Sequence, residues 1–150
     1  MIKAKYKHTN IVAKDWRKLA DFYRKIFGCI EVPPERACGE EWVERCTSVA
    51  GAAIRGIHLR LPGYGNDGPT LEIFQYNKAE NRSETAINRP GFAHIAFEVE
   101  DVEAARDKVL AAGGSCVGEL VTVDITDAGR ITFIYMTDPE GNIIELQKWH

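Results

Sequence analysis

Two pairs of side chains in this sequence have the types that a metal site requires. The first pair is His8 and Glu72, and the second is His94 and Glu145. Neutral imidazole nitrogens and carboxylate oxygens bind divalent transition metals, and two carboxylates balance the charge of such an ion in a low-dielectric cavity. If the four side chains converge, an octahedral ion keeps two positions for water or substrate.

The two pairs occupy matched positions in an internal repeat. Each histidine is followed by an aspartate after seven residues and by a glycine after twenty, which are Asp15 and Gly28 in the first half and Asp101 and Gly114 in the second. Each half then closes on a glycine that stands four residues ahead of the glutamate in an apolar run. Each histidine or glutamate alone would be interpreted as an ordinary structural residue. Their recurrence at matched positions favours a metal site, formed where the two halves combine around an approximate two-fold axis.

We expect the order β-α-β-β-β in each half, with the second strand of the first half obscured by an insertion. A β-prone run over 5–13 leads to Asp15, a helix N-cap candidate, and the apolar face from Trp16 to Phe27 predicts a helix that Gly28 ends. Asp101 has the same capping position in the second half. The other expected elements are a helix over 102–112 and strands over 52–61, 70–76, 92–99, 116–124, 130–137 and 142–148.

An insertion distinguishes the two halves. The chain from Gly28 to Gly68 is 13 residues longer than its counterpart in the second half, and we place the insertion at about 29–51. There Pro33-Pro34 is expected to break the chain, and residues 40–49 can form a short helix to which the sequence assigns no role.

We therefore expect one α+β domain over 1–150. Module one covers about 4–77, a polar linker about 78–90 and module two about 91–149.

Composition excludes several classes of protein. The 150 residues are 45% hydrophobic, which is enough for a core, and a net charge of -3 provides no basic surface for nucleic acid. The sequence shows no apolar run of signal-peptide or membrane-span length, so we expect a soluble cytoplasmic protein without a membrane partner. The four cysteines form no C-x-x-C pair and allow a disulfide, although we expect reduced, partly buried thiols; they are Cys29, Cys38, Cys46 and Cys116.

The sequence resembles the vicinal oxygen chelate superfamily, which includes glyoxalase I, methylmalonyl-CoA epimerase, fosfomycin-resistance enzymes, extradiol dioxygenases and bleomycin-binding proteins. Besides the two pairs, the resemblance rests on DFYRKIFG at 21–28, GFAHIAF at 91–97 and TDPEGNIIEL at 137–146. It implies two βαβββ modules related by a pseudo-two-fold axis, with a curved mixed sheet around a metal-containing cavity. It also implies a homodimer and one divalent ion, which can be Ni, Co, Zn, Mn or Fe.

The predicted ligand set distinguishes activities within that superfamily. A His, Glu, His, Glu set resembles bacterial-type glyoxalase I, a lactoylglutathione lyase that converts a hemithioacetal into a thioester by proton transfer through an enediolate. Glu72 or Glu145 would then be the catalytic base, leaving the metal when the small-molecule substrate arrives. The alternatives are an isomerase similar to methylmalonyl-CoA epimerase, an extradiol-type dioxygenase, and a small-molecule or drug-binding resistance protein.

Four further side chains lie in segments that could face the cavity. Arg55, Arg60 and Arg89 could hold an anionic substrate tail, although scattered arginines are usually solvated. His58 alternates with apolar neighbours and faces either the cavity or solvent, so it is not among the predicted catalytic residues. The sequence contains no assignable site for the glutathione carboxylates.

Overall fold

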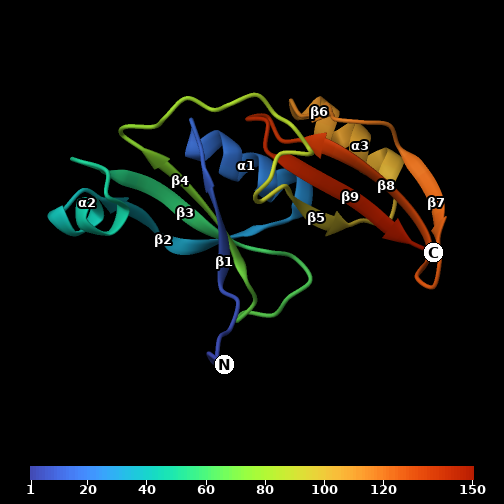
Figure 1. The fold of residues 1–150 in the computed structure, drawn as a ribbon, viewed down its shortest axis with the longest axis horizontal. Coiled ribbons are helices and arrows are strands. Elements are labelled where there is room, and N and C mark those ends of the chain that lie inside the picture. The colour runs from blue at the N-terminus through green and yellow to red at the C-terminus, as the bar shows by residue number, and fades with distance from the viewer. The chain divides into compact units, whose positions relative to one another are not determined.

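The computed structural model describes all 150 residues, Met1–His150, which form two compact units, Met1–Asn81 and Arg82–His150. Each unit contains one β-sheet (Figure 1). The boundary between the units falls inside the polar stretch 78–90. No helix has both the length and the apolar character needed to cross a membrane.

The first unit begins with strand β1 (His8–Val12), helix α1 (Trp16–Phe27) and strand β2 (Ile30–Cys38), followed by helix α2 (Glu41–Thr47) and strands β3 (Ile54–Arg60) and β4 (Thr70–Tyr76). The sheet order is β1-β4-β3-β2, with β1 parallel to β4. Asp15 accepts a hydrogen bond from the Lys18 backbone N–H at 3.2 Å, and Gly28 closes α1 with a φ of +67°. Both predicted ends of this helix are confirmed.

One face of the first sheet packs against α1. The buried side chains on that face of β3 and β4 are at most 3% exposed and are Ile57, Leu59, Leu71 and Ile73. Because neighbouring residues of a strand point to opposite faces, His58 and Glu72 lie on the other face of the sheet. The packing of α1 therefore fixes which side chains remain available for a site.

The pair Pro33-Pro34 does not break the chain, so that expectation is wrong. Strand β2 continues through both prolines, with an irregular register against β3 between Val32 and Arg36. A proline lacks the N–H that a ladder needs, but β2 is an edge strand, where a bulge accommodates the missing donor.

The helix expected within the insertion is confirmed as α2, and the structure gives it a role. Val43 of α2 is fully buried and packs with Ala52 and Ile54, against which Phe74 and Tyr76 also pack. By the alternation of β4, both aromatic residues lie on the same face as Glu72. The insertion therefore covers one end of the sheet face that carries Glu72.

The second unit contains strand β5 (His94–Glu98), helix α3 (Val102–Ala111) and strands β6 (Ser115–Cys116), β7 (Val121–Ile125), β8 (Gly129–Thr137) and β9 (Ile143–Trp149). Asp101 caps α3, accepting from the Ala104 backbone N–H at 2.9 Å, as predicted. The strand expected over 116–124 is instead two strands, because residues 117–120 lie outside the ladder between β6 and β7.

The first strand of each unit lies parallel to its last strand, and the last strand pairs antiparallel with the strand before it. The predicted α+β class with two modules of βαβββ order is thereby confirmed, with α2 added to the first module and a split strand in the second.

Candidate metal centre

The first predicted pair is assembled by the parallel ladder between β1 and β4. His8 lies opposite Thr70, and Glu72 follows two residues later, so that it projects from the same face as Thr70. The distance from His8 Nε2 to Glu72 Oε2 is 3.7 Å. Asn10, directly opposite Glu72, donates from Nδ2 to the same oxygen at 2.8 Å.

The second predicted pair is assembled by the same register in the other unit. His94 lies opposite Ile143 in the parallel ladder of β5 and β9, and Glu145 follows two residues later. His94 Nε2 is 3.0 Å from Glu145 Oε2. The spacing repeat seen in the sequence therefore corresponds to a repeated backbone register.

In both pairs the carboxylate is less exposed than the imidazole. The side chains of Glu72 and Glu145 are 13% and 12% exposed, whereas those of His8 and His94 are 45% and 29% exposed. A carboxylate that is largely removed from water needs a cationic or hydrogen-bonding partner, and a divalent cation meets that need. The donor types in each pair therefore fit a metal ion.

His58 joins the first pair and was not among the predicted site residues. It lies directly opposite Glu72 in the antiparallel ladder of β3 and β4, with its Nε2 2.8 Å from Glu72 Oε1. Its Nδ1 is 3.0 Å from Thr70 Oγ1, and its ring meets that of His8 edge-on at 5.6 Å. The ligand atoms of His8, His58 and Glu72 all lie within 4.8 Å of one another.

Burial sets the ionisation of His58. It lowers the pKa of the imidazole, and the electrostatic effects of Arg36 and His8 lower this pKa further, while the Glu72 carboxylate acts in the opposite direction. A lowered pKa favours the neutral ring, which is the form that binds metals.

Tyr135 is the counterpart of His58 in the second unit. It lies directly opposite Glu145 in the ladder of β8 and β9, and its ring centroid is 5.0 Å from that of His94. Burial and the neighbouring Glu145 carboxylate raise the pKa of Tyr135, so the phenol keeps its proton at neutral pH.

The three arginines considered as anion anchors have different surroundings. Arg60 donates to Asn66 Oδ1 at 2.9 Å, and Arg89 donates to Ser83 Oγ and to the Glu84 carbonyl oxygen at 2.7 Å. Arg55 lines a separate pocket of about 640 Å³. Arg60 and Arg89 are therefore engaged with residues close to them in the sequence.

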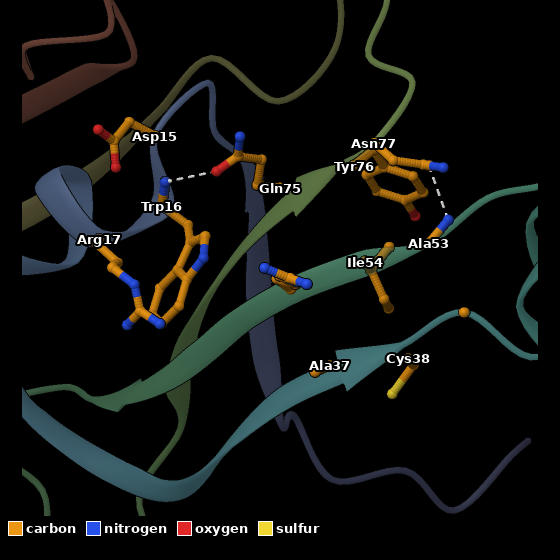
Figure 2. A pocket seen from close by; sticks show the side chains of 12 residues that line it. Asp15, Trp16, Arg17, Ala37, Cys38, Ala53, Ile54, Gln75, Tyr76 and Asn77 are labelled. Atoms are coloured by element: carbon orange, nitrogen blue, oxygen red, sulfur yellow. Dashed lines mark hydrogen bonds between the residues drawn. The ribbon is translucent and has the colours of Figure 1, made fainter.

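The pocket that Arg55 lines is shown in Figure 2. Arg17 stacks on Trp16 with its Cζ 4.2 Å from the ring centroid, and Gln75 accepts from the Trp16 backbone N–H at 3.4 Å (Figure 2). Arg17 also forms two hydrogen bonds with Glu35. None of the lining residues is a predicted metal ligand. The four cysteines of the chain are all free thiols.

Several known proteins are similar to this chain. Residues 5–146 match the Glyoxalase/Bleomycin resistance protein/Dioxygenase superfamily. A probable lactoylglutathione lyase of Vibrio parahaemolyticus is 34% identical over 91 residues, which are 59% of this chain and 60% of that protein.

Solved structures share the fold. A glyoxalase family protein from Bacillus cereus superimposes with a TM-score of 0.73 at 17% identity, covering 99% of this chain and 95% of the other. The fosfomycin resistance protein FosX from Listeria monocytogenes, solved with Mn(II) and sulfate, gives a TM-score of 0.57 at 17% identity over 100% and 95% of the two chains. With the family match spanning nearly the whole sequence, this chain belongs to the Glyoxalase/Bleomycin resistance protein/Dioxygenase superfamily.

Proposed function

We propose that this protein is a divalent-metal-dependent enzyme of the glyoxalase type, which moves a proton at the carbon next to a carbonyl group. Its substrate would be the hemithioacetal of a 2-oxoaldehyde and a thiol, and its product the isomeric thioester. The observation that carries the proposal is the repeated register that pairs His8 with Glu72 and His94 with Glu145. The similarity to a probable lactoylglutathione lyase supports it.

The four paired residues, His8, Glu72, His94 and Glu145, would hold one divalent ion between them. Two imidazoles and two carboxylates suit Ni, Co, Zn, Mn or Fe, because nitrogen and oxygen ligands select weakly among these metals. When bound, the ion would supply Lewis-acid stabilisation of negative charge on the substrate oxygens.

We assign the base to Glu145. Glu72 accepts a hydrogen bond from Asn10 and lies 2.8 Å from His58, so two side chains hold it in place. Glu145 is contacted by His94 Nε2 at 3.0 Å and has Tyr135 opposite it. Glu145 therefore has fewer side-chain contacts to break when it moves toward the substrate.

The proposed proton transfer needs no oxidant. The Glu145 carboxylate would take the proton from the carbon that carries sulfur and hydroxyl, leaving an enediolate, and would exchange that proton with solvent. It would then deliver a proton to the neighbouring carbon that was the carbonyl, while the hydroxyl proton of the sulfur-bearing carbon passes to the oxygen of the former carbonyl. The sulfur-bearing carbon becomes the thioester carbonyl, so substrate and product are isomers. General-base assistance of this kind contributes about 10²–10⁴-fold to the rate.

Solvent exchange tests the proposal. Metal-loaded protein in D₂O should introduce deuterium next to the carbonyl when it is given 2-oxoaldehyde hemithioacetals. Exchange with α-substituted acyl thioesters alone would instead indicate an isomerase similar to the epimerase. No exchange with either class, together with oxygen consumption in the presence of catechols, would overturn proton transfer in favour of a dioxygenase.

One observation favours the dioxygenase as a second candidate. His8, His58 and Glu72 form a two-histidine, one-carboxylate cluster, the ligand type of non-haem iron oxygenases. The same exchange and oxygen measurements decide between the two activities.

We also propose a homodimer. Strand β7 pairs only with β8 and exposes apolar side chains along its length, Val121, Val123 and Ile125 at 36%, 38% and 44%. An open edge with exposed apolar residues favours pairing with a second chain. Light scattering should give about twice 16.8 kDa, and a mass equal to one chain at micromolar concentration would contradict the proposal.

The four free thiols support a reducing, cytoplasmic location.

A further inference from the structure

We infer that His58 is a protein ligand of the divalent ion, and that His8, His58 and Glu72 form a three-ligand set which the first unit supplies by itself. The inference rests on the proposed metal site and extends it by a residue that the repeat does not contain. It predicts that the first unit still binds an ion, with lower affinity, when His94 and Glu145 are removed.

The ligand atoms are already near the separations that a bound ion imposes. With metal–ligand bonds of about 2.1 Å, the ligand atoms of a tetrahedral or octahedral ion lie roughly 3.0–3.4 Å apart. The observed separations are 2.8 Å from His58 Nε2 to Glu72 Oε1 and 3.7 Å from His8 Nε2 to Glu72 Oε2. Small side-chain rotations would bring both contacts to the required distance.

Neighbouring groups orient two of the three ligands. Thr70 Oγ1 lies 3.0 Å from His58 Nδ1, which leaves Nε2 directed at Glu72. Asn10 Nδ2 holds Glu72 Oε2 at 2.8 Å. Metal-binding histidines and carboxylates usually have such partners, which fix the ring orientation and raise affinity.

The surroundings of His58 limit access of water. Its side chain is 18% exposed, and the Phe74 ring meets it edge-on at 6.0 Å. Phe74 in turn packs against the cluster of Val43 and Ile54 that anchors α2. A partly desolvated imidazole beside a partly desolvated carboxylate interacts more strongly with a cation than an exposed pair does.

The second unit lacks an equivalent set. Tyr135 stands where the first unit has His58, so that unit offers one imidazole beside its carboxylate. A protonated phenol is a weaker ligand than an imidazole for these metals. We therefore expect the first unit to be the one that holds an ion alone.

The test is Co²⁺ binding to the full chain carrying His94→Ala and Glu145→Gln, measured by calorimetry and by visible absorption. His58→Leu, Thr70→Val and His150→Leu are added to this background separately. His150, whose Nε2 contacts Thr132 Oγ1 at 2.9 Å, is the matched control for loss of an imidazole outside the cluster. Circular dichroism checks that each variant is folded.

We expect the background variant to bind one Co²⁺ per chain. His58→Leu should weaken the Kd by at least about 100-fold, and Thr70→Val, which removes only an orienting group, by about 10–100-fold. His150→Leu should leave the Kd unchanged. If His58→Leu does not fold, the Kd of Thr70→Val is compared with that of His150→Leu. A weaker Kd for Thr70→Val supports the inference, and equal values overturn it.

Two results would overturn the inference: loss of Co²⁺ binding in the background variant, or equal affinities for His58→Leu and His150→Leu. These results can be distinguished from a failure of the proposed function. If wild-type protein binds metal and exchanges deuterium but His58→Leu has no effect on binding, only the role of His58 is wrong. If the background binds Co²⁺ through His58 but wild-type protein shows no exchange, only the proposed reaction is wrong.

Discussion

His58 and Tyr135 occupy equivalent positions in the two units, each directly opposite the glutamate of its unit. The repeat therefore includes a third site position beyond the His–Glu pairs, and the chemistry diverges there. In the first unit a second imidazole faces Glu72, whereas in the second a protonated phenol faces Glu145. This difference is the physical basis for assigning metal retention mainly to the first unit and proton transfer to the second.

The contribution of Glu145 to metal binding can be measured by substitution. Glu145→Gln removes one of two carboxylates that balance the charge of the ion, so metal content after dialysis should fall by at least about tenfold. Glu44→Gln is the control, because Glu44 lies in α2 and accepts a hydrogen bond from Gly51 N–H that a glutamine oxygen can also accept. Equal metal content in the two variants, determined by elemental analysis, would contradict the predicted ligand role.

Glu72→Gln and Glu145→Gln should differ in how they respond to added metal. Both should lower turnover in dilute metal, because both weaken the site. At saturating metal, Glu72→Gln should recover most of its activity, whereas Glu145→Gln should remain about 10²–10⁴-fold below wild type because its base is missing. Deuterium exchange measured over a metal titration separates the two behaviours. Full recovery of turnover by Glu145→Gln at saturating metal would show that another residue is the base.

Much of the fold could be predicted because its signals are local. Asp15 and Asp101 cap their helices, Gly28 ends the first, and the regular spacing after His8 and His94 reflects a shared strand order. The His–Glu pairs follow from that order, since the first and last strands of each unit are neighbours.

The position of His58 and the role of α2 could not be predicted, because both depend on contacts between residues that lie far apart in the sequence. The position of His58 against Glu72 is set by the register of β3 and β4 across the loop at 61–69. If the two strands are assumed to pair symmetrically about that loop, His58 falls opposite Glu72. A loop of this length permits several registers, however, so the sequence does not select this one. The role of α2 depends on Val43 reaching Phe74 and Tyr76, which no local pattern indicates.

Gly56 provides a test of how closely the strand pair is packed around Phe74, whose ring lies beside His58. A Cβ on Gly56 would lie 2.4 Å from Phe74 Cδ1 and 2.0 Å from the Ile73 carbonyl oxygen. Gly56→Ala should therefore lower the free energy of unfolding by about 1–3 kcal/mol, as overpacking does. Gly65→Ala is the matched control, because no atom lies within 4 Å of its added Cβ. Urea unfolding curves with the same midpoint for both variants would show that the strand pair relaxes without cost.

Cys29 should be the least reactive thiol of the chain. It is 4% exposed, and burial raises its pKa to about 11, so almost no thiolate forms at pH 8, whereas Cys46 and Cys116 are exposed. Iodoacetamide should therefore modify Cys46 and Cys116 in the native protein and Cys29 only after unfolding in urea, as resolved by mass spectrometry. Because the folded pKa lies above the unfolded value of 9.0, the stability that Cys29 contributes is complete below pH 9 and is lost as the pH rises toward 11. Wild type should lose stability relative to Cys29→Ala over that interval, and equal alkylation rates for Cys29 and Cys116 at pH 8 would contradict the buried, protonated thiol.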